Sequence, residues 1–211
     1  MDVEVKGRSY VKFLCVLFGK WRQEMEIGKI KKREISLFDQ GFNHKLACQL
    51  ESLIEIINKK DEITSGHSSR VALLAGQIAR QLGGSKEIIE NVEIAGIVHD
   101  VGKIGIPQEI LSKKGSLTAH EMEIMRQHPR IGWEILKDVR FLQPFLNGIL
   151  YHHERFDGRG YPCGLKGNQI PLIARILSVA DSYDAMTTSR PYRKPISPKR
   201  ALIEIMKESG A

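Results

Sequence analysis

Residues 151–162 read YHHERFDGRGYP, in which two adjacent histidines are followed by charged residues, two glycines and a proline. Successive residues of an α-helix point about 100° apart, so His152 and His153 cannot both face one point from the middle of a regular helix. Either one of them is incidental, or both serve a site at the end of a helix. The glycine-rich segment 157–169 is expected to be the main loop of the protein.

The rest of the chain has the apolar spacing of helices rather than of strands. Thr118 and Glu121 form a capping box, and Ser85 and Ser197 are further candidate N-caps. Few segments alternate apolar and polar residues over the length of a strand. These patterns predict an all-α protein, with helices over residues 46–57, 65–82, 86–99, 118–127, 131–137, 141–152, 171–186 and 198–208.

Composition places the chain among ordinary folded proteins. It is 42% apolar and 27% charged, which does not fit a disordered chain. The net charge of +7 favours an anionic partner, but it is equally typical of a solubility feature. The three cysteines include no CxxC pair, so we expect neither a disulfide framework nor a zinc cage, and we expect a reducing, cytoplasmic setting. We also expect no membrane span and no signal peptide, because the apolar run 13–18 is shorter than the ~20 residues a span needs.

The chain is expected to divide near residue 43. Residues 1–43 combine a short apolar run with the basic segment 29–33 and carry no chemical motif, so they are expected to be an N-terminal appendage or linker helix. Residues 44–211 are expected to form the helical domain that carries the site.

Histidines and aspartates gather at the ends of the expected helices. A single histidine on an apolar face is more often a hydrogen-bonded core residue than a metal ligand. Burying the whole set without a cation would leave several unsatisfied polar groups, and these side chains are ligands for divalent ions, so their joint pattern predicts a shared metal centre. The set comprises His67, His99, Asp100, His128, His152, His153 and Asp181.

Four segments resemble the signature blocks of the HD-GYP domains, a bacterial branch of the HD phosphohydrolases, and they occur in the family's order. They read GHSSRVA (66–72), HDVGKIGIP (99–107), HHERFDGRGYP (152–162) and DSYDAMTTSRPYR (181–193). The resemblance runs from about residue 46 to 210 and implies an HD-type helical bundle with a buried di-metal site and a GYP loop. Family members usually continue beyond the MKESG segment near the end of this chain, so the domain is expected to be truncated at its C-terminal end.

The resemblance implies two divalent ions. One would be held by His67, His99, Asp100 and Asp181, and Asp100 would bridge to a second ion held by His128, His152 and His153. Some family members look able to hold a third ion through a glutamate at the position of Ile63; Glu62 is one residue away from it, so two ions are expected. Mixed imidazole and carboxylate ligands favour iron or manganese.

Asp100 and Lys103 are the expected catalytic residues. Two ions about 3.5–4 Å apart can lower the pKa of a shared water, and Lys103 would offset charge on the phosphoryl oxygens unless it is only a surface lysine. By resemblance, the expected substrate contacts are Arg190, Arg193, Gly158, Gly160 and Tyr161, against the alternatives of a solvated charged loop and an ordinary turn. Residues expected to orient ligating imidazoles or Lys103, unless they are simply surface residues, are Glu154, Asp157 and Asp184. No role is assigned to His44, His120 or the cysteines.

The resemblance implies a phosphodiesterase of bacterial second-messenger signalling that opens bis-(3′-5′)-cyclic di-GMP to pGpG, with onward hydrolysis to GMP left open. One alternative is hydrolysis of another cyclic dinucleotide such as cyclic GMP-AMP. Another is a non-catalytic nucleotide sensor or adaptor. No polymeric nucleic acid is expected as a partner. Regulatory domains, signalling proteins and an oligomeric state are left open.

Overall fold

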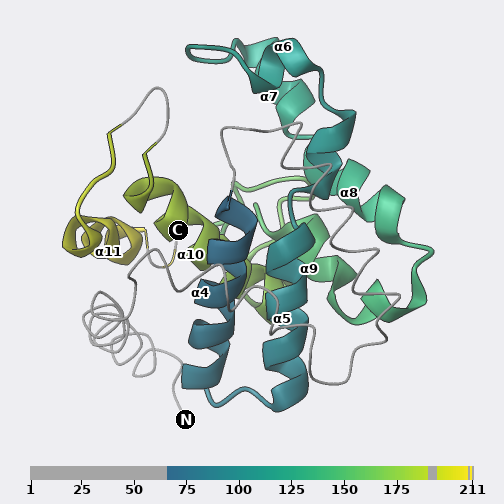
Figure 1. Ribbon diagram of the computed structural model, residues 1–211, viewed down its shortest axis with the longest axis vertical. Helices are drawn as coiled ribbons and strands as arrows, with labels where there is room; N and C mark the ends of the chain where they lie inside the picture. Colours follow the sequence, from purple (N-terminus) through teal and green to yellow (C-terminus); the bar gives the residue numbers. More distant parts are fainter. Residues whose placement is uncertain (1–65, 190–193, 209, 211) are drawn as a thin grey trace.

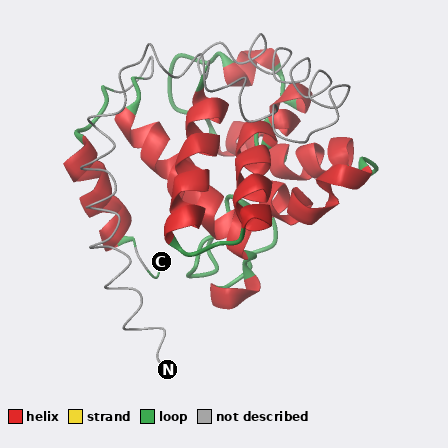
Figure 2. Cartoon of the chain, turned by 60° about the horizontal axis from the view of Figure 1, so that its bottom comes forward, coloured by secondary structure: helices red, strands yellow, loops and turns green. Residues whose placement is uncertain are grey.

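The computed structural model describes residues 66–189, 194–208 and 210, and all regular secondary structure in these residues is helical (Figure 2). The predicted all-α fold is confirmed. The expected appendage over residues 1–43, the helix over 46–57, Ile63, Arg190 and Arg193 lie outside the described residues.

Two antiparallel helices, α4 (His67–Gln81) and α5 (Lys86–Val98), lie side by side at the centre of the fold (Figure 1). Gly83 makes the turn between them with a φ of 72°, and the Ser85 hydroxyl caps α5 by accepting a hydrogen bond from the N–H of Ile88. The helices can approach closely because Gly96 has no side chain; a Cβ there would lie 2.6 Å from the Cα of Ala72. Because the pair is antiparallel, the start of α4 and the end of α5 meet at the same end of the hairpin.

The chain then continues through short helices. A 3₁₀ turn η2 (Val101–Gly105) leads to α6 (Gln108–Leu111) and α7 (Ala119–Met125), which project from one end of the molecule in Figure 1. Next come α8 (His128–Leu136), η3 (Arg140–Phe145) and α9 (Leu146–Tyr151). The last elements are η4 (Gly167–Gln169), α10 (Leu172–Thr187) and α11 (Pro198–Lys207).

Most expected helix starts are confirmed, including the Thr118–Glu121 capping box and the Ser197 N-cap. Two predictions are wrong, both around a proline. His128, expected between the helices over 118–127 and 131–137, begins α8 instead, because Pro129 fits the first turn of a helix, where its missing N–H is not needed. The single helix expected over residues 141–152 is divided into η3 and α9, because Pro144 cannot donate the hydrogen bond of a helix interior.

The core forms where α4, α5, α9 and α10 pack together. Its largest fully buried side chains include Leu74 on α4, Ile149 on α9, and Leu177 and Tyr183 on α10. The packing holds the ends of several helices in fixed positions around one end of the α4–α5 hairpin. Within the described residues, no helix combines the length and apolar character needed to cross a bilayer.

Candidate metal centre

The side chains predicted to bind metal converge at the end of the α4–α5 hairpin. His67 is the first residue of α4, His99 and Asp100 follow α5, and His128 is the first residue of α8. His152 and His153 follow α9, and Asp181 comes from α10. Five of the seven histidines of the chain therefore meet at one place.

Their ligand atoms fall into two groups that are joined by a third. One group contains His67, His99 and Asp181, and the other contains His128, His152 and His153. In each group the donor atoms all lie within 4.8 Å of one another, and the same holds for a linking group of His99, Asp100 and His152. The structure thus brings together both ligand sets that the resemblance implies.

Asp100 lies between the two groups and faces both of them. Its Oδ1 is 3.4 Å from Nε2 of His128, whereas its Oδ2 is 3.4 Å from Nε2 of His99 and 3.9 Å from Nε2 of His67. One carboxylate therefore presents an oxygen to each group. Burial alone would raise the pKa of Asp100, but the charge of Lys103 and the neighbouring imidazoles hold it well below its usual range, so the carboxylate is ionised.

Three imidazoles are oriented by hydrogen bonds to the backbone. Nδ1 of His99 lies 2.7 Å from the Gly96 carbonyl oxygen, Nδ1 of His128 lies 2.8 Å from that of Met125, and Nδ1 of His152 lies 2.7 Å from that of Ile149. A carbonyl only accepts, so each Nδ1 carries the proton. In the neutral ring, Nε2 is then a bare lone pair, which is the form that binds a metal.

The lone pairs left by this arrangement fit a cation. Nε2 of His99 is buried and has no hydrogen-bond partner. Nε2 of His128 lies 3.3 Å from Nε2 of His152, so two acceptor atoms face each other. A buried acceptor without a donor is costly, and a divalent ion bound between these atoms would remove that cost.

His67 is oriented by a side chain instead of the backbone. Its Nδ1 lies 2.7 Å from Oδ2 of the buried Asp184, and its Nε2 lies 3.1 Å from Oδ1 of Asp181. Burial lowers the pKa of His67, but the hydrogen bonds to Asp181 and Asp184 outweigh burial and raise it to about 9. A proton on Nε2 and a metal ion would compete for the same lone pair.

The second group is neutral at pH 7. Burial, reinforced by neighbouring imidazoles, lowers the pKa of His128 and His152, and it lowers the pKa of His153 to about 4. These three rings are therefore available as ligands without losing a proton first.

Lys103 lies at the edge of the centre. Its Nζ is 2.8 Å from Oδ2 of Asp100, and its side chain is only 16% exposed. It is not the freely solvated surface lysine of the alternative interpretation.

The GYP loop lies against the second group. The Tyr161 ring stacks on the His153 ring with centroids 4.7 Å apart, and the Tyr161 N–H donates to the His153 carbonyl over 3.2 Å. Gly158 has a φ of 84°, whereas Gly160 is needed for space, because a Cβ there would lie 2.2 Å from the backbone nitrogen of Arg155.

The three carboxylates expected to orient other groups behave differently. Asp184 contacts His67 as expected. Glu154 requires a correction, because its two oxygens accept hydrogen bonds from the N–H groups of Cys163 and Leu165, so it holds the GYP loop together. The expectation for Asp157 is also corrected, because this carboxylate pairs with two arginines of the same loop, Arg155 and Arg159, rather than with an imidazole.

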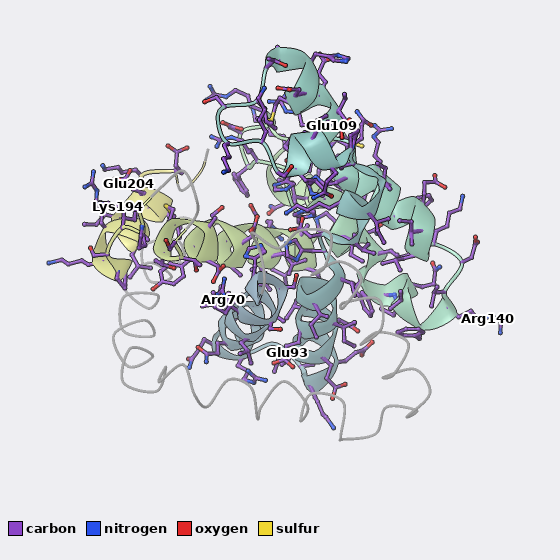
Figure 3. All side chains as sticks on the ribbon, turned by 45° about the horizontal axis from the view of Figure 1, so that its top comes forward. Arg70, Glu93, Glu109, Arg140, Lys194 and Glu204 are labelled. Atoms are coloured by element: carbon purple, nitrogen blue, oxygen red, sulfur yellow. The ribbon has the colours of Figure 1, made fainter. Side chains whose placement is uncertain are left out.

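One residue of the centre was missed from the sequence. Arg70 on α4, labelled in Figure 3, faces α10 and donates two hydrogen bonds to Asp184, over 2.6 Å from Nε and 3.0 Å from a terminal nitrogen. The available signal was its position three residues after His67, which places both side chains on one face of the helix.

The chain is similar to a family model, to curated proteins and to solved structures. A family model described as "HD domain" matches residues 51–211. The cyclic di-GMP phosphodiesterase response regulator RpfG of Xanthomonas campestris pv. campestris is 44% identical over 90% of this chain and 52% of its own length. A cyclic di-GMP phosphodiesterase of Thermotoga maritima is 44% identical over 76% of this chain and 45% of its own length.

A relative with another named substrate and a solved structure complete the comparison. The 3'3'-cGAMP-specific phosphodiesterase 2 of Vibrio cholerae is 33% identical over 92% of this chain and 40% of its own length. The HD domain of the Listeria monocytogenes phosphodiesterase PgpH superposes with a TM-score of 0.56 at 23% identity, over 74% of this chain and 83% of that one, and so supports the fold. The chain spans about half the length, or less, of these curated relatives.

Proposed function

The chain belongs to the HD domain family, and from that membership we propose that it is a metal-dependent phosphodiesterase that opens cyclic di-GMP to pGpG. The substrate is taken from the names of the two relatives that are 44% identical. The observation that carries the proposal is Asp100, whose carboxylate presents one oxygen to each of two groups of mostly buried metal-ligand atoms. Onward cleavage of pGpG to GMP belongs to the same proposal.

The proposed ions are two divalent cations, iron or manganese. One would be held by His67, His99, Asp100 and Asp181, and the other by His128, His152 and His153 together with Asp100. Imidazole and carboxylate donors suit these metals, and no cysteine belongs to the groups found among the described residues. When bound as a pair, such ions activate a water at neutral pH and offset charge on a phosphoryl group.

The chain's own residues then have distinct tasks. Asp100, ionised and buried, fixes the spacing of the two groups. Lys103 Nζ, 2.8 Å from Asp100, would donate a hydrogen bond to a phosphoryl oxygen and stabilise the negative charge that develops there. The imidazoles of His99, His128 and His152 are already in the tautomer that leaves Nε2 free, so these three rings bind an ion without rearranging their protons. His67 must first lose its proton from Nε2.

Substrate contacts are proposed for the GYP loop and for the segment after α10. Tyr161, Gly158 and Gly160 lie on the loop that covers the second group, where backbone can approach a ligand closely. Arg190 and Arg193 carry the planar guanidinium groups that suit bidentate contact with phosphate. A cytoplasmic location and association with regulatory domains are proposed with this activity.

The proposal is tested by incubating the purified chain with cyclic di-GMP and either Mn²⁺ or Fe²⁺, and separating pGpG from GMP by chromatography. We expect His99→Ala and Asp100→Ala to lower turnover by more than the 10–100-fold that loss of an outer hydrogen-bond partner costs. The matched control is His120→Ala, because His120 is an exposed histidine of α7 outside the centre. If the parent hydrolyses cyclic di-GMP no faster than His99→Ala and Asp100→Ala, the assignment is refuted.

A second candidate substrate is 3'3'-cGAMP, because a relative named for that activity is 33% identical over 92% of this chain. Parallel assays with the two cyclic dinucleotides at equal concentration distinguish them by the ratio of kcat/KM. Binding of either nucleotide without product, in the presence of both metals, would instead identify the chain as a sensor or adaptor.

A further inference from the structure

His153 differs from the other four histidines of the centre in how its ring is held. The others each place Nδ1 against a fixed acceptor, which is Asp184 for His67 and a main-chain carbonyl for His99, His128 and His152. In the part of the chain that the structure describes, the His153 ring takes part in aromatic contacts and in no hydrogen bond. Something other than a hydrogen bond must therefore set its orientation.

The Tyr161 ring is the group placed to do so. It stacks on His153 with an interplanar angle of 27°, whereas His128 meets the same ring nearly edge-on at 84°. Offset stacking fixes the plane of an aromatic ring, and such pairs are favourable in buried surroundings. The main chain reinforces the pairing, because the N–H of Tyr161 donates to the carbonyl of His153 over 3.2 Å.

The position of Tyr161 is itself secured from several sides. Glu154, buried, accepts the N–H groups of Cys163 and Leu165 over 2.6 and 2.9 Å and so closes the loop around the tyrosine. The guanidinium carbon of Arg126, at the end of α7, lies over the Tyr161 ring, 5.5 Å from its centroid. A cation over an aromatic face is attracted by the ring, and most strongly where water is partly excluded.

We propose that Tyr161 is the positioning residue of His153 and that Arg126 supports it. The ring face of Tyr161 takes the place that a hydrogen-bond acceptor takes at the other four histidines. This inference rests on the dinuclear centre of the proposed function and adds a cause for the tyrosine of the GYP loop. Stacking fixes the ring plane but does not select a tautomer, so His153 is the ligand whose hold depends most on the loop. The affinity for the second ion should therefore depend on Tyr161, and the affinity for the first ion should not.

The test is a titration of the metal-free protein with Mn²⁺, in which calorimetry and the electron paramagnetic resonance of free Mn²⁺ resolve two binding steps. We expect Tyr161→Leu to weaken one of the two steps by about 10- to 100-fold, the range for loss of a group that orients a ligand, and to leave the other unchanged. The unchanged step also shows that the variant is folded. Tyr161→Phe, which keeps the ring, should bind both ions as the parent does.

Arg126→Gln should weaken the same step by about 2- to 5-fold, in keeping with an exposed cation–π contact. Phe156→Leu is the matched control for the tyrosine, because Phe156 belongs to the same loop and is 40% exposed. Arg140→Gln is the control for the arginine, because Arg140 is an exposed residue of η3 (Figure 3).

Two binding steps that persist unaltered in Tyr161→Leu would overturn this inference alone. Equal weakening in Tyr161→Phe and Tyr161→Leu would also overturn it, because the hydroxyl and not the ring would then be responsible. A parent protein that binds a single ion would overturn the dinuclear proposal and this inference together. The readout is metal binding, so none of these three outcomes depends on which nucleotide the protein hydrolyses.

Discussion

Replacing Gly102 with alanine should push apart the two segments that carry Asp100 and His128. Gly102 is buried in η2, directly beside the first turn of α8. A Cβ at this position would lie 1.8 Å from the carbonyl oxygen of His128 and 2.5 Å from the backbone nitrogen of Gly132. Both neighbours are main-chain atoms, so no side chain can turn away. Carbon contacts are favourable only near 3.5–4 Å, so the segments must separate by roughly 1.5 Å.

The magnitude follows from what this separation disturbs. Overpacking a tight interior costs about 1–3 kcal/mol, and at this chain length each kcal/mol lowers the melting temperature by about 2–4 °C. The displacement also moves His128 away from Asp100, whose Oδ1 now lies 3.4 Å from Nε2. Misplacing a reacting group by about 1 Å can cost on the order of 100-fold in turnover. We therefore expect a lower melting temperature, weaker binding of the second ion, and a large loss of activity.

The assay combines thermal unfolding of the metal-free protein, Mn²⁺ titration and turnover of cyclic di-GMP. The matched control is Gly115→Ala in the segment between α6 and α7, because no heavy atom lies within 4 Å of a Cβ built there. It should leave all three measurements within error of the parent. If Gly102→Ala melts with the parent and keeps both metal affinities, then the contact between η2 and α8 does not place His128, and the reasoning is refuted.

Three further predictions concern the surroundings of the centre. Arg70→Met removes a partner of Asp184, which orients the first-ion ligand His67. In a Mn²⁺ titration it should lower the affinity for the first ion by about 10- to 100-fold and spare the second. Equal losses of affinity for both ions would contradict this. Arg80→Ala leaves the buried Glu93 carboxylate without its charged partner and should lower the free energy of unfolding at pH 7 by about 1–3 kcal/mol with no loss of metal. Because burial raises the pKa of Glu93 and Arg80 opposes that rise, the deficit should shrink as the pH falls through the pKa of Glu93 and the carboxyl becomes neutral; a deficit independent of pH would contradict this. Removing metal with a chelator should lower the melting temperature, and Mn²⁺ at 100 times its Kd should restore about 2.7 kcal/mol of the free energy of unfolding. A melting temperature that does not change on addition of Mn²⁺ would argue against the centre.

The residues of the metal centre could be predicted from the sequence because most of them stand at the ends of helices. Glycine and proline mark two of these helix ends in the sequence, since His67 follows Gly66 and His128 precedes Pro129. The two adjacent histidines illustrate this, because α9 ends at Tyr151, His152 caps it with a φ of −66°, and His153 lies in the turn beyond. Neither histidine is constrained by the 100° step of a continuing helix, so both can face the same group.

The partners of the acidic residues were not predictable in the same way. Glu154, Asp157 and Asp184 look alike in sequence, since each is an acidic residue close to a motif. Their roles are decided by contacts that sequence position does not reveal. Asp184 meets Arg70 from 114 residues away, whereas Glu154 meets backbone N–H groups that the fold of its own loop brings back to it.

The same distinction explains why three histidines of the centre share one geometry and two do not. Carbonyl groups in the last turn of a helix lack a helical N–H partner. His99, His128 and His152 each place Nδ1 against the carbonyl three residues earlier, at or near such an end, so one hydrogen bond satisfies the backbone and fixes the tautomer. This arrangement needs no distant residue and is therefore inherent in a histidine that follows a helix.

His67 stands at the start of a helix, where the free backbone groups are N–H donors and cannot accept from an imidazole. It must take its acceptor from another element, and α10 supplies Asp184. His153 lies two residues beyond the end of α9, in the turn after the cap residue His152. Its orientation has to come from the loop that follows, and the loop presents the Tyr161 ring. His67 and His153, which the helix ends do not orient, thus depend on Asp184 and on Tyr161, and variants of these two partners should each affect one ion.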